Sequence, residues 1–286
     1  MSHKACICYI SWGRIEYTKK SIASILENTN REDFDLIWWD NGSDKEMTEW
    51  IKQICIENNF YYIFFKKNEG LTKAMNNQMK IMSKIFNYDV FCHIANDIIC
   101  PPNWLNGVFE AIKSKKVGVV GLNLEFTDFE KVMVDGVELE KIRPDGNICG
   151  AHYCIPRWIY ELLGGFRDVH GGYGQQDANH SLQVKSLPMD VWLYYLPLDK
   201  YRGEDLGGTG KTYDDYQKQI EQRLRWSGSD PTGGRNYREL LKSYRRKYDN
   251  KQITSEQLID LLREKECMGI DMSQLAETNL PMEFLG

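Results

Sequence analysis

Short apolar runs alternate with longer amphipathic stretches over the first 122 residues of the chain. The short runs, rich in β-branched and aromatic residues, are residues 5–10, 34–39, 61–65, 90–94 and 117–122. Runs of this length and composition are typical of buried strands. Between them apolar residues recur at helical spacing, as Tyr17, Ile22 and Ile25 do. This alternation predicts an α/β fold with a mainly parallel sheet and helices on both faces.

The start of the second helix carries a local signal of its own. Ser43 and Glu46 have the spacing of a capping box, in which the first side chain accepts a hydrogen bond from the backbone and the second reaches back. Met47, Trp50 and Ile51 follow on one helical face. The sequence therefore predicts a helix that is capped by Ser43.

The pattern loosens after Leu124. A short helix is predicted at residues 156–163, where Gly164 is suited to end it, and a last strand is predicted at residues 191–196. From Tyr213 onward the pattern is helical and polar. We therefore expect one domain over residues 1–210, with a first half (1–122) and a second half (123–210), followed by a helical extension over residues 211–286.

Composition adds a charge asymmetry to this picture. The chain has 286 residues, 42% of them hydrophobic, and a formal net charge of −5, which is ordinary for a folded protein and excludes no partner. Residues 211–251 contain eleven Lys or Arg against six Asp or Glu, which predicts a basic face near the C-terminus.

Cysteine use and hydropathy bear on the cellular compartment. The eight cysteines are scattered without paired CxxC motifs, and Cys6, Cys8 and Cys92 lie within apolar runs, where a thiol behaves as a small hydrophobe. Neither a signal peptide nor an apolar run of about 18 residues is apparent. A reduced, cytoplasmic protein without a transmembrane segment is expected.

Acidic residues follow two of the predicted strands directly. Asp40 comes after the strand at 34–39, and Asp97 follows the strand at 90–94. In open α/β sheets, ligands bind where the carboxyl ends of the strands meet. Carboxylates at that edge predict a ligand site, and carboxylate oxygen is the donor that hard divalent cations prefer.

Four longer motifs resemble a known family. They are WWDNGSD (38–44), NEGLTKAMN (68–76), ANDIICPPNWL (95–105) and GGFRDVHGGYGQQDAN (164–179). Their order and spacing resemble the nucleotide-sugar glycosyltransferases of the GT-A fold, family 2 in particular, and the fourth motif is similar to a segment of galactosyltransferases. The resemblance extends from about residue 5 to about residue 198, and it implies that residues 1–122 form a nucleotide-binding half and residues 123–210 an acceptor half.

This resemblance implies an inverting, metal-dependent glycosyltransferase that moves a sugar from a nucleoside-diphosphate sugar, with UDP as the expected nucleotide. A divalent cation, Mn²⁺ or Mg²⁺, would neutralise the departing diphosphate. The family's last metal-binding acid corresponds to Asp97, whereas Ala95 and Asn96 replace the earlier positions. No histidine follows His180 to match the family's later ligand, and Glu204 or Asp205 is the expected substitute.

The family's catalytic base corresponds to Asp177, and deprotonation of an acceptor hydroxyl needs such a group within hydrogen-bond reach. An alternative is that Asp177 only caps the helix after it. Gln176 replaces the acid that precedes the base in the family. Together with Tyr173 and His152, Gln176 is a weaker candidate for binding the acceptor.

The resemblance also points to a set of donor-binding residues. They are Asp40, Asn68, Gly70, Lys73, Asn96 and Arg202. Asp40 would contact the nucleoside and Arg202 the diphosphate. Asp40, Asn68 and Gly70 are equally suited to plain turns at strand ends.

The acceptor is the least defined part of the prediction. A saccharide is the default that the family implies. A hydroxylated nucleic-acid base is a rival, because residues 223–248 interleave cations with aromatic residues. A third reading is a sugar-nucleotide-binding protein without catalysis, suggested by Ala95 and Gln176, which stand where the family has acids.

Overall fold

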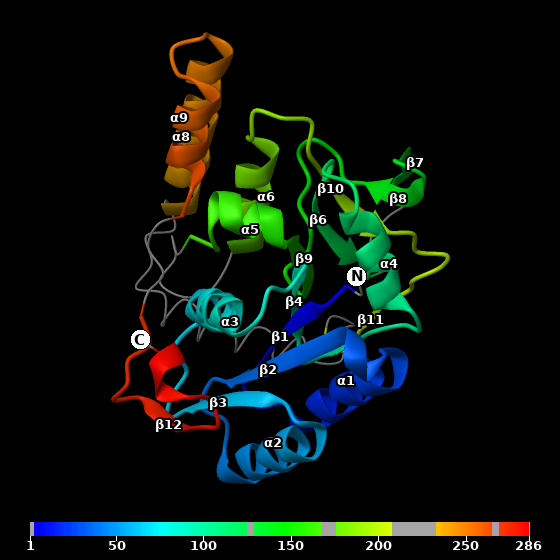
Figure 1. Ribbon diagram of the computed structural model, residues 1–286, viewed down its shortest axis with the longest axis vertical. Coiled ribbons are helices and arrows are strands. Elements are labelled where there is room, and N and C mark those ends of the chain that lie inside the picture. The colour runs from blue at the N-terminus through cyan, green and yellow to red at the C-terminus, as the bar shows by residue number, and fades with distance from the viewer. Residues whose placement is uncertain (1–2, 125–128, 168–175, 208–232, 265–268, 286) are drawn as a thin grey trace.

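The computed structural model describes residues 3–124, 129–167, 176–207, 233–264 and 269–285. Its centre is a ten-stranded sheet with the order β12-β3-β2-β1-β4-β9-β6-β10-β8-β7 (Figure 1). The strands are β1 (Ala5–Ser11), β2 (Phe34–Asp40), β3 (Tyr61–Phe65), β4 (Val90–Ala95), β6 (Val117–Leu122), β7 (Glu130–Val134), β8 (Val137–Lys141), β9 (His152–Pro156), β10 (Trp192–Leu196) and β12 (Leu275–Thr278). Two short strands, β5 (Ile98–Ile99) and β11 (Glu204–Asp205), pair with each other apart from this sheet.

Helices flank the sheet on both faces (Figure 1). They are α1 (Ile15–Asn28), α2 (Lys45–Asn58), α3 (Leu71–Ile85), α4 (Trp104–Ile112), α5 (Arg157–Leu163), α6 (Gln176–Lys185), α8 (Gly233–Asp249) and α9 (Ser255–Leu262). Single 3₁₀ turns occur at η1 (Arg31–Asp33) and η2 (Met282–Phe284).

The direction of the strands divides the sheet into two parts. The neighbours β3, β2, β1 and β4 all run parallel, as the sequence of the first half predicts. Farther along the sheet, β9 inserts antiparallel between β4 and β6, and β10 runs parallel to β6. The predicted α/β class is confirmed, and the sheet as a whole is mixed.

Side-chain alternation along β1 explains why helices cover both faces. Ala5, Ile7 and Tyr9 belong to the core that includes apolar residues of α1, α2 and α4. Cys6 and Cys8 point to the opposite core, which includes residues of α3, α5 and α6. Because both faces are buried, β1 is apolar at nearly every position, which is the pattern that central parallel strands show.

The predicted capping box at Ser43 is wrong. The N-cap of α2 is Asp44, whose side chain accepts a hydrogen bond from the Met47 backbone N–H at 2.9 Å. The Ser43 hydroxyl instead donates to the Asp40 carboxylate at 2.6 Å and accepts from the Gly13 N–H at 2.8 Å. The Ser43 hydroxyl therefore binds the buried Asp40 carboxylate and does not cap α2, contrary to the prediction from the local sequence pattern.

The C-terminal part of the chain is helical only in part. In Figure 1, α8 and α9 stand together and project from the body of the molecule. After them β12 returns and pairs antiparallel with β3, and the backbone N–H of Lys66 donates to the Gln274 carbonyl at 2.9 Å. The sequence predicted no strand here, and its division of the chain at residue 210 stays a prediction. Within the described ranges, no helix is both long and apolar enough to cross a membrane.

Candidate active site

Asp40 organises the loops at the carboxyl edge of the sheet. It lies at the end of β2, is 0% exposed, and accepts hydrogen bonds from the Ser11 hydroxyl at 2.7 Å and from the Ser43 hydroxyl and N–H at 2.6 and 2.8 Å. Burial raises the pKa of Asp40, and the bonds from Ser43 and Ser11 oppose that shift. Both carboxylate oxygens are thus engaged by the protein. Asp40 therefore stabilises the turn at the end of β2, which is the structural role that its position also allowed. A contact between Asp40 and the nucleoside stays a prediction.

The segment after β4 meets the loop between β1 and α1. The Asn96 side-chain amide donates to the Thr18 hydroxyl at 2.8 Å and to the Gly13 carbonyl at 3.2 Å. The Asp97 carboxylate accepts from the Arg14 guanidinium, with an Nη1 to Oδ2 distance of 2.6 Å. Sequence reasoning missed Arg14. The available signal was its place in a Gly-Arg pair directly after the first strand, at the same edge as Asp40 and Asp97.

Asp205 reaches the same place through β11. The register of the short sheet sets Asp205 opposite Ile98, and the Leu206 N–H donates to the Asp97 carbonyl at 2.9 Å. Burial raises the pKa of Asp97, the charge of Asp205 raises it further, and Arg14 opposes the shift. Two carboxylates therefore lie within electrostatic reach of each other, as expected if Asp205 substitutes for the family's later ligand.

Asp177 is the second residue of α6 and faces the turn before β9. Its Oδ2 accepts from the Gly150 N–H at 2.9 Å, and its Oδ1 accepts from the Ala178 N–H at 2.8 Å. Burial raises the pKa of Asp177, whereas these two N–H groups and the charge of Arg238 lower it. A side chain at position 150 would press on Asp177, because a Cβ there would lie 3.1 Å from the Asp177 Cβ.

The charges of three carboxylates act on Cys149. Burial is the main reason why the pKa of Cys149 rises to about 11, and the charges of Asp177, Asp205 and Asp97 add to the shift. Asp177 also contacts this turn directly, through the Gly150 N–H. The fold thus brings acids that are widely separated in the sequence within electrostatic reach of one turn.

The loop between β3 and α3 carries the predicted donor residues 68–73. The Asn68 side chain accepts from the Gly70 N–H at 3.0 Å, and Gly70 has a φ of 96°, a conformation that favours glycine. Lys73 pairs with Glu69 at 2.6 Å, and each side chain is only 10% exposed. The Asn41 side chain accepts from the Glu69 N–H at 3.3 Å, which ties this loop to the end of β2.

The remaining predicted residues are placed less favourably. His152 is fully buried, accepts from the Leu122 N–H at 3.2 Å and packs against Trp104 with ring centroids 5.0 Å apart. Burial lowers the pKa of His152 to about 3, so the ring is neutral, and it is not brought to the site. Gln176 is buried at the start of α6, and Arg202 is exposed before β11. Tyr173 lies outside the described residues.

The donor set suits a divalent cation that takes part of its coordination from a ligand. No group of three or more His, Cys, Asp or Glu that could hold a metal occurs in the described part of the chain. Burial raises the pKa of Asp97 and the charge of Asp205 raises it further, so Asp97 and Asp205 act on each other as a pair of carboxylates. Mg²⁺ in particular is commonly held by one or two carboxylates together with phosphates and water.

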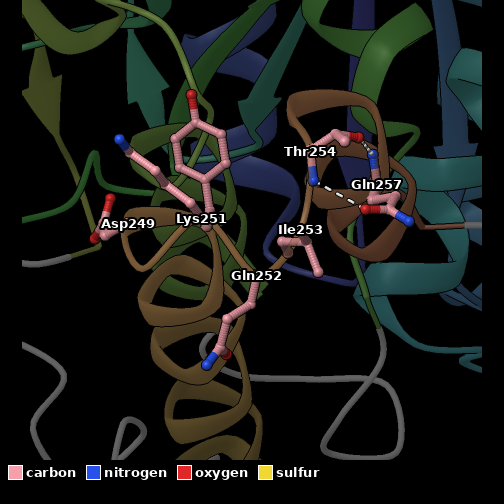
Figure 2. A pocket seen from close by; sticks show the side chains of 7 residues that line it. Asp249, Lys251, Gln252, Ile253, Thr254 and Gln257 are labelled. Atoms are coloured by element: carbon pink, nitrogen blue, oxygen red, sulfur yellow. Dashed lines mark hydrogen bonds between the residues drawn. The ribbon is translucent and has the colours of Figure 1, made fainter.

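A surface hollow of about 440 Å³ lies elsewhere, at the turn between α8 and α9 (Figure 2). Asp249, Lys251 and Ile253 contribute to its wall. Thr254 and Gln257 also line it, and they form the capping box that begins α9, whose hydrogen bonds are drawn as dashed lines in Figure 2. None of the predicted site residues lines this hollow.

Comparison with known proteins agrees with the fold and with the motifs. Residues 6–136 match the family model of glycosyl transferase family 2. The fold is similar to the mannosyltransferase PcManGT from Pyrobaculum calidifontis, solved with GDP-Man and Mn²⁺, at 12% identity and a TM-score of 0.54, over 92% of this chain and 73% of that one.

It is also similar to GalNAc-T7, solved with UDP, GalNAc and Mn²⁺, at 13% identity and a TM-score of 0.54, over 87% of this chain and 57% of that one. No curated protein sequence gives a significant match. The similarity of residues 164–179 to galactosyltransferases stays a prediction. The chain therefore has the GT-A fold of these glycosyltransferases, and residues 6–136 resemble glycosyl transferase family 2.

Proposed function

We propose that this protein is an inverting glycosyltransferase that uses Mn²⁺ or Mg²⁺ to transfer a sugar from a UDP-sugar to an acceptor hydroxyl of a saccharide. The observation that carries the proposal is the placement of three acids: Asp97 and Asp205 lie on paired segments at the carboxyl edge of the sheet, and Asp177 lies against the turn at Gly150. Sugar transfer needs a cation beside the leaving diphosphate and a base beside the acceptor. This cluster supplies a carboxylate pair for the cation and a separate carboxylate for the base.

On the donor side, Asp97 and Asp205 would hold the cation. When bound, the cation would neutralise charge that develops on the diphosphate. The loop at residues 68–73 and the buried Lys73–Glu69 pair would line the nucleotide, and Asn96 would hold the loop after β1 in place. Exposed Arg202, next to β11, would contribute a positive charge near the diphosphate.

On the acceptor side, Asp177 would accept the proton of the hydroxyl. As the hydroxyl oxygen attacks the anomeric carbon, the bond from that carbon to the diphosphate breaks on the opposite side, so the configuration inverts. Burial raises the pKa of Asp177, which increases its strength as a base toward a hydroxyl. The Gly150 and Ala178 N–H groups would keep the carboxylate oriented during the transfer.

A screen of nucleotide sugars by thermal shift, with and without Mn²⁺, tests the proposal. A ligand that binds only the native state raises the melting temperature by mass action. We expect a UDP-sugar to stabilise the protein in an Mn²⁺-dependent way and to be hydrolysed slowly to UDP. Binding without any hydrolysis would favour the non-catalytic reading. A protein that neither binds nor hydrolyses any nucleotide sugar with any metal would contradict the proposal.

A second candidate acceptor is nucleic acid, and the position of α8 favours it. Lys242, Arg246 and Lys247 are exposed along this helix, which projects from the body of the molecule (Figure 1). α8 packs against α6, the helix that carries Asp177, so α8 extends outward from the element that holds the proposed base. A run of exposed cations that leads toward Asp177 would bind the phosphate backbone of a nucleic acid. It would thereby present a hydroxylated nucleobase to Asp177 for sugar transfer.

Reversal of these charges tests the second candidate. The triple variant Lys242→Glu, Arg246→Glu, Lys247→Glu should bind duplex DNA about tenfold or more weakly than wild type, with a salt dependence reduced by about one unit of slope for each lost phosphate contact. Fluorescence anisotropy at several salt concentrations measures both effects. A control that reverses the exposed Lys45, Lys113 and Lys115 should bind as wild type does. Wild type that binds no DNA at low salt would remove this candidate.

A further inference from the structure

Arg14 stands out because its backbone adopts a conformation that non-glycine residues rarely do. Its φ is 62° and its ψ is 43°, in the left-handed region, and the preceding Gly13 also has a φ of 62°. Residues other than Gly, Asn and Asp pay a steric cost there, and such residues cluster at ligand sites. The fold therefore maintains an unfavourable backbone conformation at the residue that pairs with Asp97.

Contacts from three elements hold this conformation. The Gly13 N–H donates to the Ser43 hydroxyl at 2.8 Å, and the Gly13 carbonyl accepts from the Asn96 side chain at 3.2 Å. Within α1, the Thr18 hydroxyl donates to the Arg14 carbonyl at 3.1 Å. The loop is thus fixed from the ends of β2 and β4 and from its own helix, so the guanidinium is presented at a defined place on the carboxyl edge of the sheet.

The Arg14 guanidinium has binding capacity left over. One N–H donates to Asp97 at 2.6 Å, and the group lies over the Tyr17 ring with a separation of 5.2 Å. A guanidinium carries five N–H donors, and within the described residues the others have no hydrogen-bond partner. The side chain is 27% exposed, against 14% for Asp97. The pair is therefore open to solvent from the arginine side.

The surroundings of the pair leave little room for an additional side chain. Gly207 follows β11, and a Cβ at this position would collide with the Asp97 carboxylate and lie 3.0 Å from Arg14 Nη2. The Gly207 N–H donates to Asp205 at 2.8 Å. Asp97 and Arg14 thus both lie against the Asp205–Gly207 segment. A divalent cation that binds Asp97 must then share or replace the arginine.

We propose that Arg14 is a diphosphate-binding residue that exchanges partners when the donor binds. Without donor, its guanidinium neutralises Asp97. When the metal and nucleotide bind, the cation takes the Asp97 carboxylate, and Arg14 turns its N–H groups to the diphosphate oxygens beside it. The planar guanidinium matches phosphate geometry and stays charged, so it suits both partners. This inference rests on the proposed function, because it concerns the same donor site.

The exchange predicts two opposite effects of one variant, Arg14→Met, on the affinities for Mn²⁺ and for UDP. This substitution removes the charge but keeps much of the side-chain length. Loss of a competing cation should tighten Mn²⁺ binding in the absence of nucleotide by severalfold. Loss of the charged hydrogen bonds to diphosphate should weaken UDP binding at saturating Mn²⁺ by about tenfold or more. Electron paramagnetic resonance of free Mn²⁺ measures the first affinity, and calorimetry with UDP measures the second.

Two further variants keep the test interpretable. Arg14→Lys keeps a cation without the planar fork and should fall between wild type and Arg14→Met for UDP. Lys20→Met removes an exposed cation from the same helix and should change neither affinity. Unchanged UDP affinity in Arg14→Met, or weaker Mn²⁺ binding in that variant, would overturn the exchange even if wild type binds Mn²⁺ and UDP. Wild type that binds neither would overturn the proposed function and this inference with it.

Discussion

Replacement of Asp97 by asparagine is expected to abolish Mn²⁺-stimulated hydrolysis of the donor, with a loss of about a thousandfold or more in kcat. Removal of this carboxylate leaves Asp205 as the remaining acid of the proposed metal pair, and a bound metal contributes several kcal/mol to stabilising a leaving group. Steady-state hydrolysis of a UDP-sugar, measured over a range of Mn²⁺ concentrations, gives both the rate and the metal requirement.

The Asp97→Asn protein should remain folded. Burial and Asp205 raise the pKa of Asp97, which means that the folded state disfavours its charged form. An uncharged residue of the same size relieves that cost, while it weakens the contact with Arg14. Asp135→Asn is a matched control, because Asp135 also pairs with a cation, Lys116, at 2.6 Å in the turn between β7 and β8. Full Mn²⁺ stimulation of Asp97→Asn would contradict the metal role.

The second large effect is expected for Asp177→Asn, which should bind UDP as wild type does and lose sugar transfer by about a hundredfold to ten-thousandfold. An amide cannot accept the proton of the attacking hydroxyl, whereas Asp97 and the donor loops are untouched. Transfer to water serves as the assay, because the same base would activate a water molecule, and calorimetry with UDP and Mn²⁺ tests the donor site separately.

A local cost of this substitution must be separated from loss of the base. The two oxygens of Asp177 accept from the Gly150 and Ala178 N–H groups, and asparagine has only one oxygen for them. One mismatched hydrogen bond costs about 1–3 kcal/mol of stability, which a thermal melt detects. Asp190→Asn, at an aspartate that accepts from the Trp192 ring N–H at 2.9 Å, is the control. Transfer at the wild-type rate by Asp177→Asn would rule out its role as the base.

The elements that depend on local patterns were predictable from the sequence. The strands at 61–65 and 117–122 have the predicted bounds, because each is an apolar run that ends in polar or glycine-rich sequence. The acids at the strand ends were also identifiable, since an abrupt change from apolar to acidic residues marks the edge of a sheet. The placement of Asp40 and Asp97 at one edge followed from topology, because parallel strands bring their carboxyl ends to the same edge of a sheet.

The features that depend on contacts between distant residues were not predictable. Arg14 gains its position from a left-handed backbone held by Ser43 and Asn96, and the Gly-Arg pair after the first strand does not by itself reveal that Asp97 is the partner. His152 stands next to the turn at Gly150, but it begins β9 and its side chain points into the core toward Trp104. Side chains alternate between the two faces of β9, and this alternation turns His152 toward the core. The sequence around the turn did not reveal at which residue β9 begins.

The pairing of β12 with β3 has a consequence for how the protein forms. The Thr278 hydroxyl bonds to the Tyr62 carbonyl across 216 residues of sequence. During synthesis, therefore, β3 has no partner on this side until nearly all of the described chain has left the ribosome. Pairing between such distant segments is slow, and an open strand edge invites association with other chains. The open edge of β3, beside the loop that would hold the nucleotide, is thus one place where nascent protein is exposed to aggregation.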